Sequence, residues 1–347
     1  MRVIITGSSG QIGTNLALRL VRDGHDVFGI DKRRNTWTSD FPYLLQDLSG
    51  HYPSFPTGIG GVDYPKSDVV VHLAAHAKVH QLVREPHRAL ENMVMTYNVL
   101  EYCRQTATPI IFSSSREVYG DIHRFDTEET TADFAYTEST YSASKIAGEA
   151  LIYSYSRCYD LPYLVFRFSN VYGRYDADIG RMVRVIPLFV QRLSRDLPIT
   201  VYGADKVLDF THVDDCVEGI VRGIEGLSTG TARNETINLA YGKGNTLVRM
   251  AELVGDTLGK TPVITVAPAL LGEVTHYVAN IGKAASLLGY TPAVSLEEGI
   301  PKAVEWQLDW MASAPRPGLP PAPEDHLSAI DQENGAGLAF KKEPVRR

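Results

Sequence analysis

The sequence predicts an α/β fold, with a doubly wound, mostly parallel sheet and a smaller α/β lobe interleaved with it. Three observations predict this architecture. Short apolar runs alternate with helical patterns through the first half, glycines follow the first run at once, and the alternation loosens after about residue 171. Short buried strands separated by helices imply right-handed crossovers, which produce a parallel sheet covered by helices on both faces.

Each element is predicted from its local pattern. The sheet strands are the apolar runs at 2–6, 26–30, 69–74, 109–112 and 163–168. Helices are expected at 11–23, 88–106, 213–225 and 246–258, and further short strands at 199–202 and 236–239. Five prolines between 315 and 323 cannot sustain a helix, so the end of the chain is expected to be an irregular tail.

Composition excludes several classes of protein. The 347 residues carry a net charge of -7, so no overall positive field attracts nucleic acid. Cys103, Cys158 and Cys216 fit neither a disulfide framework nor zinc spacing, which favours a reducing compartment. The first apolar run is too short for a signal peptide, and no window approaches the ~20 apolar residues of a membrane span. We therefore expect a soluble, cytoplasmic protein.

A glycine-rich turn predicts a dinucleotide site. Gly7, Gly10 and Gly13 follow the first strand and enter the first helix, where glycines let the backbone approach a pyrophosphate at a helix N-terminus. Asp31 ends the second strand, where its carboxylate can bind an adenosine ribose and repel a 2′-phosphate. This favours NAD, although the adjacent Lys32 leaves NADP open. Plain turn roles for the glycines and for Asp31 are the alternative.

Tyr141 and Lys145 are candidate catalytic residues because they lie four apart on one face of a predicted helix. A free tyrosine titrates near ~10, but an ammonium group and a nicotinamide cation nearby favour its phenolate. Tyr141 could then take a proton from a sugar hydroxyl while hydride leaves the same carbon. Ser115 would hydrogen-bond the oxygen that becomes a carbonyl. Chance spacing on an amphipathic helix is the alternative interpretation.

Together these motifs resemble the extended short-chain dehydrogenase/reductase family, and more narrowly its NAD-dependent nucleotide-sugar epimerase/dehydratase branch. The resemblance also includes "QDL" at 46–48, "HLAA" at 72–75 and "RFSNVYG" at 167–173, and it runs to about residue 310. It implies a Rossmann sheet and an NAD site. The residues it places in that site are Gly7, Gly10, Gln11, Ile12, Gly13, Asp31, Lys32, Asp47, Leu48, Leu73, Ala74, Ala75, Lys78, Asn92, Tyr141, Lys145 and Phe168.

The resemblance implies a nucleotide-sugar site too, with Tyr202 stacking on the base and Asn170 contacting the diphosphate. Relatives have arginines near the diphosphate where this chain has Leu208 and Leu270. Either other cations replace them or the substrate is not a usual UDP-sugar. The predicted substrate residues are Lys78, Ser115, Glu117, Asn170, Arg181, Arg184, Val185, Val201, Tyr202 and Lys206. The implied domains are an NAD-binding domain over 1–170 and 209–241, a substrate lobe over 171–208 and 242–312, and a tail over 313–347.

Arg116-Glu117 departs from the family pattern. Dehydratases of this branch carry Asp-Glu there, and an arginine that stays charged cannot serve as their acid. Glu117 keeps the position of the C5 base, which decarboxylases also occupy with glutamate; a solvated or arginine-paired glutamate is the alternative. His76 and His80 share helical spacing, but no convincing third ligand accompanies them, so no metal is predicted.

The resulting expectation is a nucleotide-sugar 4-epimerase of the UDP-hexose or UDP-hexuronate class, acting by transient C4 oxidation. The alternatives are a dehydratase or decarboxylase that uses Glu117, and a catalytically silent NAD-binding scaffold. By analogy with the family, which pairs through the Tyr-bearing helix and the helix before the fifth strand, a homodimer is expected. No nucleic-acid or membrane partner is expected.

Overall fold

The computed structural model describes residues 1–50, 58–59, 62–63, 66–120, 124–130, 135, 137–176, 184–269 and 272–313. The chain divides into two compact units, Met1–Gln307 and Leu308–Arg347. All the elements below belong to the first unit, except that the last helix ends in the second. Within the described ranges, no helix combines the length and apolar character needed to cross a membrane.

The central sheet has seven strands, all parallel, in the order β13-β9-β7-β6-β1-β2-β3. Their bounds are Arg2–Thr6 (β1), Asp26–Asp31 (β2), Tyr43–Leu45 (β3), Val69–His72 (β6), Ile110–Ser115 (β7), Tyr163–Phe168 (β9) and Glu235–Leu239 (β13). The strand order reverses between β1 and β6, which pair directly. This confirms the predicted doubly wound α/β fold, and in such sheets ligands bind beyond the carboxyl ends at the point of reversal.

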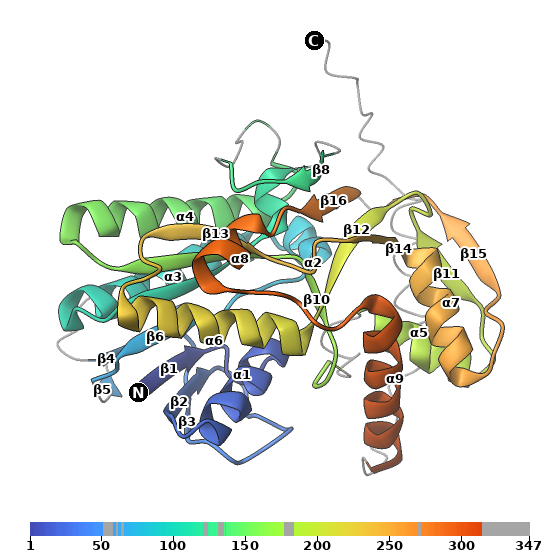
Figure 1. Cartoon of the computed structure of the whole chain (residues 1–347), viewed down its shortest axis with the longest axis horizontal. Coiled ribbons are helices and arrows are strands. Elements are labelled where there is room, and N and C mark those ends of the chain that lie inside the picture. The colour runs from blue at the N-terminus through green and yellow to red at the C-terminus, as the bar shows by residue number, and fades with distance from the viewer. Residues whose placement is uncertain are drawn as a thin grey trace. The chain divides into compact units, whose positions relative to one another are not determined.

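Successive residues of β1 face opposite sides of the sheet and enter different cores. Val3 and Ile5 pack in the core formed with helices α1 (Gln11–Arg22), α6 (Val213–Thr229) and α8 (Gly282–Leu288). Ile4 packs in the core formed with α3 (His87–Thr106) and α4 (Thr140–Tyr159). Figure 1 shows α3 and α4 on one face of the sheet and α1 and α6 on the other. Because both faces are covered, the strands are continuous apolar runs, as read from the sequence.

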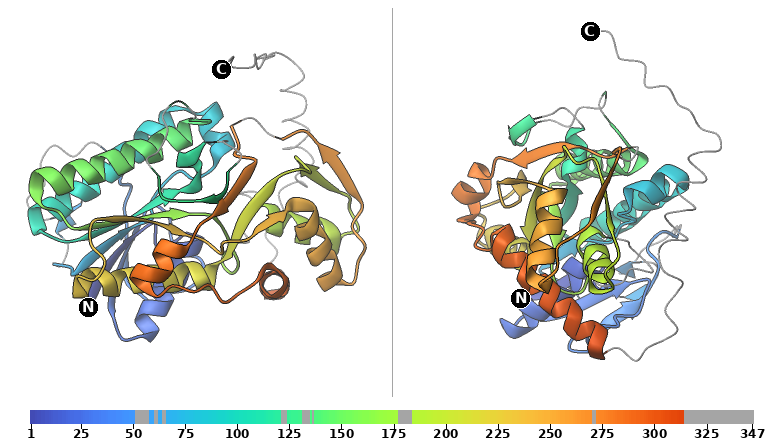
Figure 2. Two further views of the ribbon diagram at one scale, coloured as in Figure 1. Left: turned by 45° about the horizontal axis from the view of Figure 1, so that its top comes forward. Right: turned by 90° about the vertical axis from the view of Figure 1, so that its right-hand side faces the viewer.

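The second half of the chain adds a lobe with a hydrophobic core of its own, which includes Phe189, Val201, Leu253 and Ile300. Its helices are α5 (Val185–Ser194), α7 (Leu247–Leu258) and α9 (Leu296–Ser313). Its strands form a sheet of β10 (Asn170–Tyr172), β12 (Val207–His212), β16 (His276–Ala279) and β8 (Arg124–Thr127), with β14 (Gly244–Thr246) on β12, and a pair of β11 (Ile199–Tyr202) and β15 (Ile264–Ala267). Figures 1 and 2 show α5, α7, β11 and β15 grouped on one side of the central sheet.

Candidate functional site

In the turn between β1 and α1, backbone atoms of neighbouring segments lie very close to the glycines. Gly7 has φ +73°, and a Cβ placed there would lie 2.7 Å from the backbone nitrogen of Ala74. A Cβ on Gly13 would lie 2.3 Å from the carbonyl oxygen of Gly7. Larger residues at these two positions would collide with backbone, so the glycines allow the turn to pack on itself and on the segment after β6.

The N-terminus of α1 is suited to an anionic group. Its N-cap residue Gly10 offers no side-chain cap to the first-turn N–H groups, and the first turn holds no acidic residue. Gln11 follows, and its Nε2 is buried with no hydrogen-bond acceptor among the described residues. Helix N–H groups without a side-chain cap and an unsatisfied buried amide are donors that a pyrophosphate would satisfy. The residues present therefore fit the phosphates of a dinucleotide.

Asp31 is held at the end of β2 by two backbone donors. Its Oδ2 accepts from the N–H of Ser9 at 3.0 Å, and its Oδ1 accepts from the N–H of Arg33 at 2.9 Å. The carboxyl group is buried, next to the glycine turn. This is where the sequence predicts the ribose contact. Asn35 on the following loop was not predicted: its Nδ2 donates to the carbonyl of Ser8 at 3.3 Å and fixes the loop against the turn.

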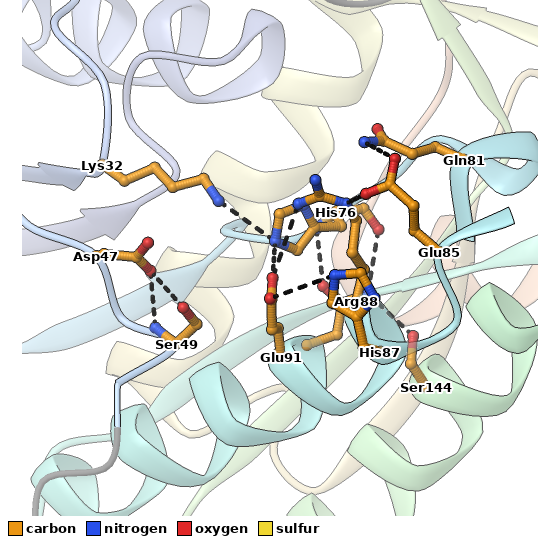
Figure 3. A network of polar contacts seen from close by, with 11 residues as sticks. Lys32, Asp47, Ser49, His76, Gln81, Glu85, His87, Arg88, Glu91 and Ser144 are labelled. Atoms are coloured by element: carbon orange, nitrogen blue, oxygen red, sulfur yellow. Dashed lines mark hydrogen bonds and ion pairs between the residues drawn. The ribbon is translucent and has the colours of Figure 1, made fainter.

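A polar network lies near the adenosine end of the predicted NAD site (Figure 3). His76 is its centre, with Nε2 2.6 Å from Glu91 Oε2 and 3.3 Å from Lys32 Nζ. Burial and the charge of Lys32 lower the pKa of His76, and the Glu91 carboxylate opposes them. Burial also acts to raise the pKa of Asp47, but hydrogen bonds from Ser49 and the charge of Lys32 outweigh it and lower that pKa. Lys32 is thus placed between two of the segments that the sequence assigns to NAD.

Asn92 fixes the loop that follows β6. Its Oδ1 accepts from the N–H of His76 at 2.7 Å, and its Nδ2 donates to the carbonyl of His76 at 3.1 Å. The same Nδ2 lies 3.1 Å from Ser144 Oγ on α4. The amide of this predicted cofactor residue is therefore engaged in joining the loop to α4, the helix that carries Tyr141 and Lys145, and it positions both.

Helix α4 carries Tyr141 and Lys145 onto the carboxyl end of β7. The helix begins at Thr140, capped by Ser139, whose Oγ accepts from the N–H of Ser142 at 3.1 Å. Gly148 allows a close approach to the sheet, since a Cβ there would lie 2.5 Å from the Phe112 ring. Lys145 Nζ donates to the carbonyl of Ser113 at 2.6 Å and lies 5.9 Å from the centre of the Tyr141 ring.

Ser115 stands beside the Tyr141 phenol. It ends β7, and its hydroxyl forms a side-chain hydrogen bond with Tyr141 that lowers the tyrosine pKa. Burial is the larger influence and raises the pKa of Tyr141 to about 12; the Glu117 carboxylate acts in the same direction, and Arg116 and Arg184 oppose it. Burial also lowers the pKa of Lys145 to about 8. The predicted drop in the Tyr141 pKa is therefore not present in the protein alone, because desolvation outweighs the nearby cations.

Arg116 and Glu117 are not a surface pair. They occupy the short 3-10 helix η1 (Arg116–Tyr119), whose four residues are all buried. Arg116 Nη2 lies 3.0 Å from Glu117 Oε1, and it also donates to Asn170 Oδ1 at 3.2 Å. The solvated-glutamate alternative is excluded, whereas the arginine-paired one describes the geometry, and both charges act on the Tyr141 phenol. Asp209, which was not predicted, accepts from the Asn170 amide through its backbone carbonyl at 3.0 Å.

Arg184, a predicted phosphate cation, lies at the dinucleotide turn. It caps α5, donates from Nη1 to Gln11 Oε1 at 2.9 Å, and pairs through Nε with Asp176 Oδ1 at 3.0 Å. Burial raises the pKa of Asp176 to about 7, and the charge of Arg184 opposes that shift. Arg184 also acts on Tyr141, so this one guanidinium lies within reach of both predicted motifs.

Other predicted substrate residues are placed differently. The buried Lys206 ammonium pairs with the half-buried carboxylate of Glu273, which also contacts His80 at 3.1 Å, so Lys206 is already neutralised. Val201 is fully buried in the core of the lobe. Val185 is exposed and Tyr202 half-buried, while Arg181 and Leu270 lie outside the described residues.

Among the remaining cofactor predictions, Leu48 and Phe168 are core residues, and Ile12, Leu73, Ala74, Ala75 and Lys78 are partly buried at the carboxyl edge of the sheet and its first helix.

Comparison with known proteins identifies the type of site. A sequence profile described as "NAD dependent epimerase/dehydratase family" matches residues 3–240. The chain is 29% identical to a "Probable UDP-glucuronate 4-epimerase" of Rhizobium meliloti, over 88% of this chain and 96% of the relative. It is 30% identical to "UDP-glucuronic acid decarboxylase 2" of Arabidopsis thaliana, over 88% of this chain and 68% of the relative. A solved UDP-glucose 4-epimerase of Thermotoga maritima superposes with a TM-score of 0.74 at 27% identity, covering 90% of this chain and all of that one.

Proposed function

Because the chain belongs to the NAD dependent epimerase/dehydratase family, we propose that it is a nucleotide-sugar 4-epimerase of the UDP-hexose or UDP-hexuronate class. The proposal depends on one observation: Ser115, Tyr141 and Lys145 lie together at the carboxyl end of β7. Arg184 connects this group to the glycine turn through Gln11. The named activities of the relatives from Rhizobium and Thermotoga support it.

Tyr141, Ser115 and Lys145 would have different roles at the C4 oxygen of the sugar. When bound, NAD supplies the acceptor and donor of a hydride, and its nicotinamide adds the positive charge that Tyr141 needs in order to ionise. Tyr141 takes the proton of the C4 hydroxyl and returns it after the sugar has presented its other face. Ser115 hydrogen-bonds the oxygen as it becomes a carbonyl, and Lys145 holds its ammonium under the phenol.

The test is turnover of UDP-, GDP-, dTDP- and CDP-sugars by the purified protein in deuterated water. We expect interconversion of one pair of C4 epimers with no solvent deuterium at C4, because the same hydride returns to the carbon from which it came. Protein that retains NAD but converts none of these sugars would contradict the proposal. It would instead support the silent scaffold that the sequence left open.

A second candidate activity is supported by the position of Glu117. This carboxylate is buried beside the Tyr141 phenol, where it could remove a C5 proton from a 4-keto sugar, and one relative is named a decarboxylase. Arg116 stands where dehydratases have an acid, which disfavours loss of a C6 hydroxyl. Solvent deuterium at C5, or release of carbon dioxide from a hexuronate, would favour this activity over simple 4-epimerisation.

We also propose a cytoplasmic homodimer that pairs through α3 and α4. Leu90 and Tyr97 on α3 are 62% and 45% exposed, so this helix presents two large apolar side chains that a second copy could cover. The three cysteines are all free thiols, in keeping with a reducing compartment. Sedimentation of the wild-type protein and of a Leu90→Lys variant tests the dimer; a wild-type protein that sediments as a monomer contradicts it.

A further inference from the structure

Arg116 has bonding capacity that the protein does not use. The guanidinium is buried, and its Nη2 is engaged by Glu117 at 3.0 Å and by Asn170 at 3.2 Å. Nη1 is buried as well, but it has no hydrogen-bond acceptor among the residues that the structure describes. A buried charged donor without an acceptor is costly, whereas an acceptor supplied by a ligand would remove that cost.

The position of Arg116 indicates which part of a ligand it would meet. It directly follows Ser115, whose hydroxyl bonds to the Tyr141 phenol at the proposed C4 oxygen. In a hexopyranose the carbon next to C4 on the ring-oxygen side is C5, which carries C6. The charge of Arg116 acts on the Tyr141 phenol itself, so the guanidinium lies close to the proposed C4 oxygen and within reach of a substituent on C5.

We propose that Nη1 of Arg116 binds the C6 carboxylate of a nucleotide-hexuronate, so that this arginine makes the enzyme prefer uronates to hexoses. The inference rests on the proposed function, and it names the substrate class within it. Charge favours a carboxylate over a hydroxymethyl group, because arginine–carboxylate hydrogen bonds are about twice as strong as neutral ones. Glu117 occupies only Nη2, so the guanidinium can bridge two carboxylates.

The surrounding charges can accommodate the added negative charge. Arg116 and Glu117 together are neutral, and the buried Lys145 ammonium donates to a neutral carbonyl, that of Ser113. The Glu149 carboxylate acts on Lys145 through its charge, but Glu149 is itself paired with Arg167. The charge of Arg116 also acts on the buried carboxyl group of Asp209, which accepts hydrogen bonds from backbone N–H groups. A uronate carboxylate would be attracted by the Lys145 ammonium as well as held by Arg116.

The experiment uses three ligands that differ only at C6: UDP-glucuronate (carboxylate), UDP-glucose (hydroxymethyl) and UDP-xylose (no C6). Their affinities for the NAD-loaded protein are measured by calorimetry. We expect the wild type to bind UDP-glucuronate on the order of tenfold more tightly than the other two. Arg116→Gln should reduce that preference to less than about threefold while leaving the affinity for UDP-xylose unchanged. The matched control is Arg222→Gln, which removes an arginine that pairs with Glu218 on the surface of α6 and should keep the full preference.

The outcomes separate this inference from the proposed function. The inference is overturned if the wild type binds the three ligands equally tightly or binds none of them. It is also overturned if Arg116→Gln loses affinity for all three ligands to the same extent. If Arg116→Gln does not fold, the same three affinities are measured in Arg116→Lys, where a reduced preference supports the inference and an unchanged one overturns it. If the wild type prefers UDP-glucuronate, the Arg116 variant loses that preference and the wild type epimerises no sugar, the role of Arg116 stands and the 4-epimerase proposal fails.

Discussion

At the scale of single residues, Tyr141 depends on groups that lie far apart in the sequence. Burial holds its pKa at about 12, and hydrogen bonding to Ser115 together with the charges of Arg116 and Arg184 only partly opposes this. A phenol with that pKa is protonated at neutral pH. Ionisation therefore has to be coupled to the arrival of positive charge, which would keep Tyr141 inactive until the cofactor is bound.

The Tyr141→Phe variant tests this role. Removing the hydroxyl removes the group that moves the proton, so we expect turnover to fall by about 10²–10⁴-fold with little change in NAD content. Turnover and bound NAD are measured on the same preparation. Tyr159→Phe is the control, because that ring is 55% exposed at the far end of the same helix. Turnover of Tyr141→Phe within threefold of wild type would exclude the assignment.

At the scale of elements, α4 is fixed to the sheet by a buried ion pair. Arg167 on β9 donates to both carboxylate oxygens of Glu149 on α4, at 2.9 and 2.7 Å. Ser114, one residue before Ser115, donates to the same carboxylate. Glu149 lies one helical turn beyond Lys145, so this ion pair fixes the position of α4 on β7.

Breaking the anchor should destabilise the protein strongly. We expect Arg167→Met to lower the free energy of unfolding by about 3–5 kcal/mol, because it leaves the Glu149 carboxylate buried without a cation. The measurement is denaturation by urea, monitored by circular dichroism. The double variant Arg167→Met/Glu149→Gln removes both charges and should recover part of the loss. A double variant that is less stable by the sum of the two single effects would show that the two residues are not coupled.

At the scale of the whole molecule, Arg184 connects the lobe to the dinucleotide turn through hydrogen bonds. It begins α5 in the lobe, contacts Gln11 on α1, and donates to the carbonyl of Val171 at 3.0 Å. We expect Arg184→Ala to raise the Michaelis constant for the nucleotide sugar far more than it lowers turnover. Retained NAD should also dissociate faster, because Gln11 loses a partner. Steady-state kinetics and dialysis of the holoenzyme check both effects; an unchanged Michaelis constant would remove Arg184 from the substrate site.

Acid stability is a second property of the whole fold. Burial lowers the pKa of His72, in the centre of the sheet, from 6.5 to about 3, so the folded protein keeps this imidazole neutral. The unfolded chain binds the proton near pH 6.5. The contribution of His72 to stability is thus fully present above pH ~6.5 and is lost as the pH falls towards 3, by about 5 kcal/mol at most.

We expect the midpoint of thermal unfolding of the wild type to fall relative to that of a His72→Asn variant as the pH is lowered from 7 to 4, because only the wild type loses the contribution of His72. His87→Asn is the control because His87 is exposed on α3 and should leave the pH dependence unchanged. An identical pH dependence in the wild type and in His72→Asn would show that other groups control acid unfolding. Burial also raises the pKa of Asp209 to about 6 and that of Asp176 to about 7. These two carboxyl groups stabilise the fold at low pH, and this stabilisation is lost as the pH rises through the two values. They therefore act against the loss of stability that His72 causes at low pH.

The sequence by itself determined the parallel sheet, the glycine turn and the spacing of Tyr141 and Lys145. Those features depend on local patterns: apolar runs, residues without a Cβ, and positions one helical turn apart. The tertiary structure decided which charges meet. Lys206 was expected to be available for phosphate but pairs with Glu273, 67 residues away in the chain, and Arg116 is buried against Asn170, 54 residues away. Burial and long-range pairing set the state of a charged side chain, and neither can be read from the residues beside it.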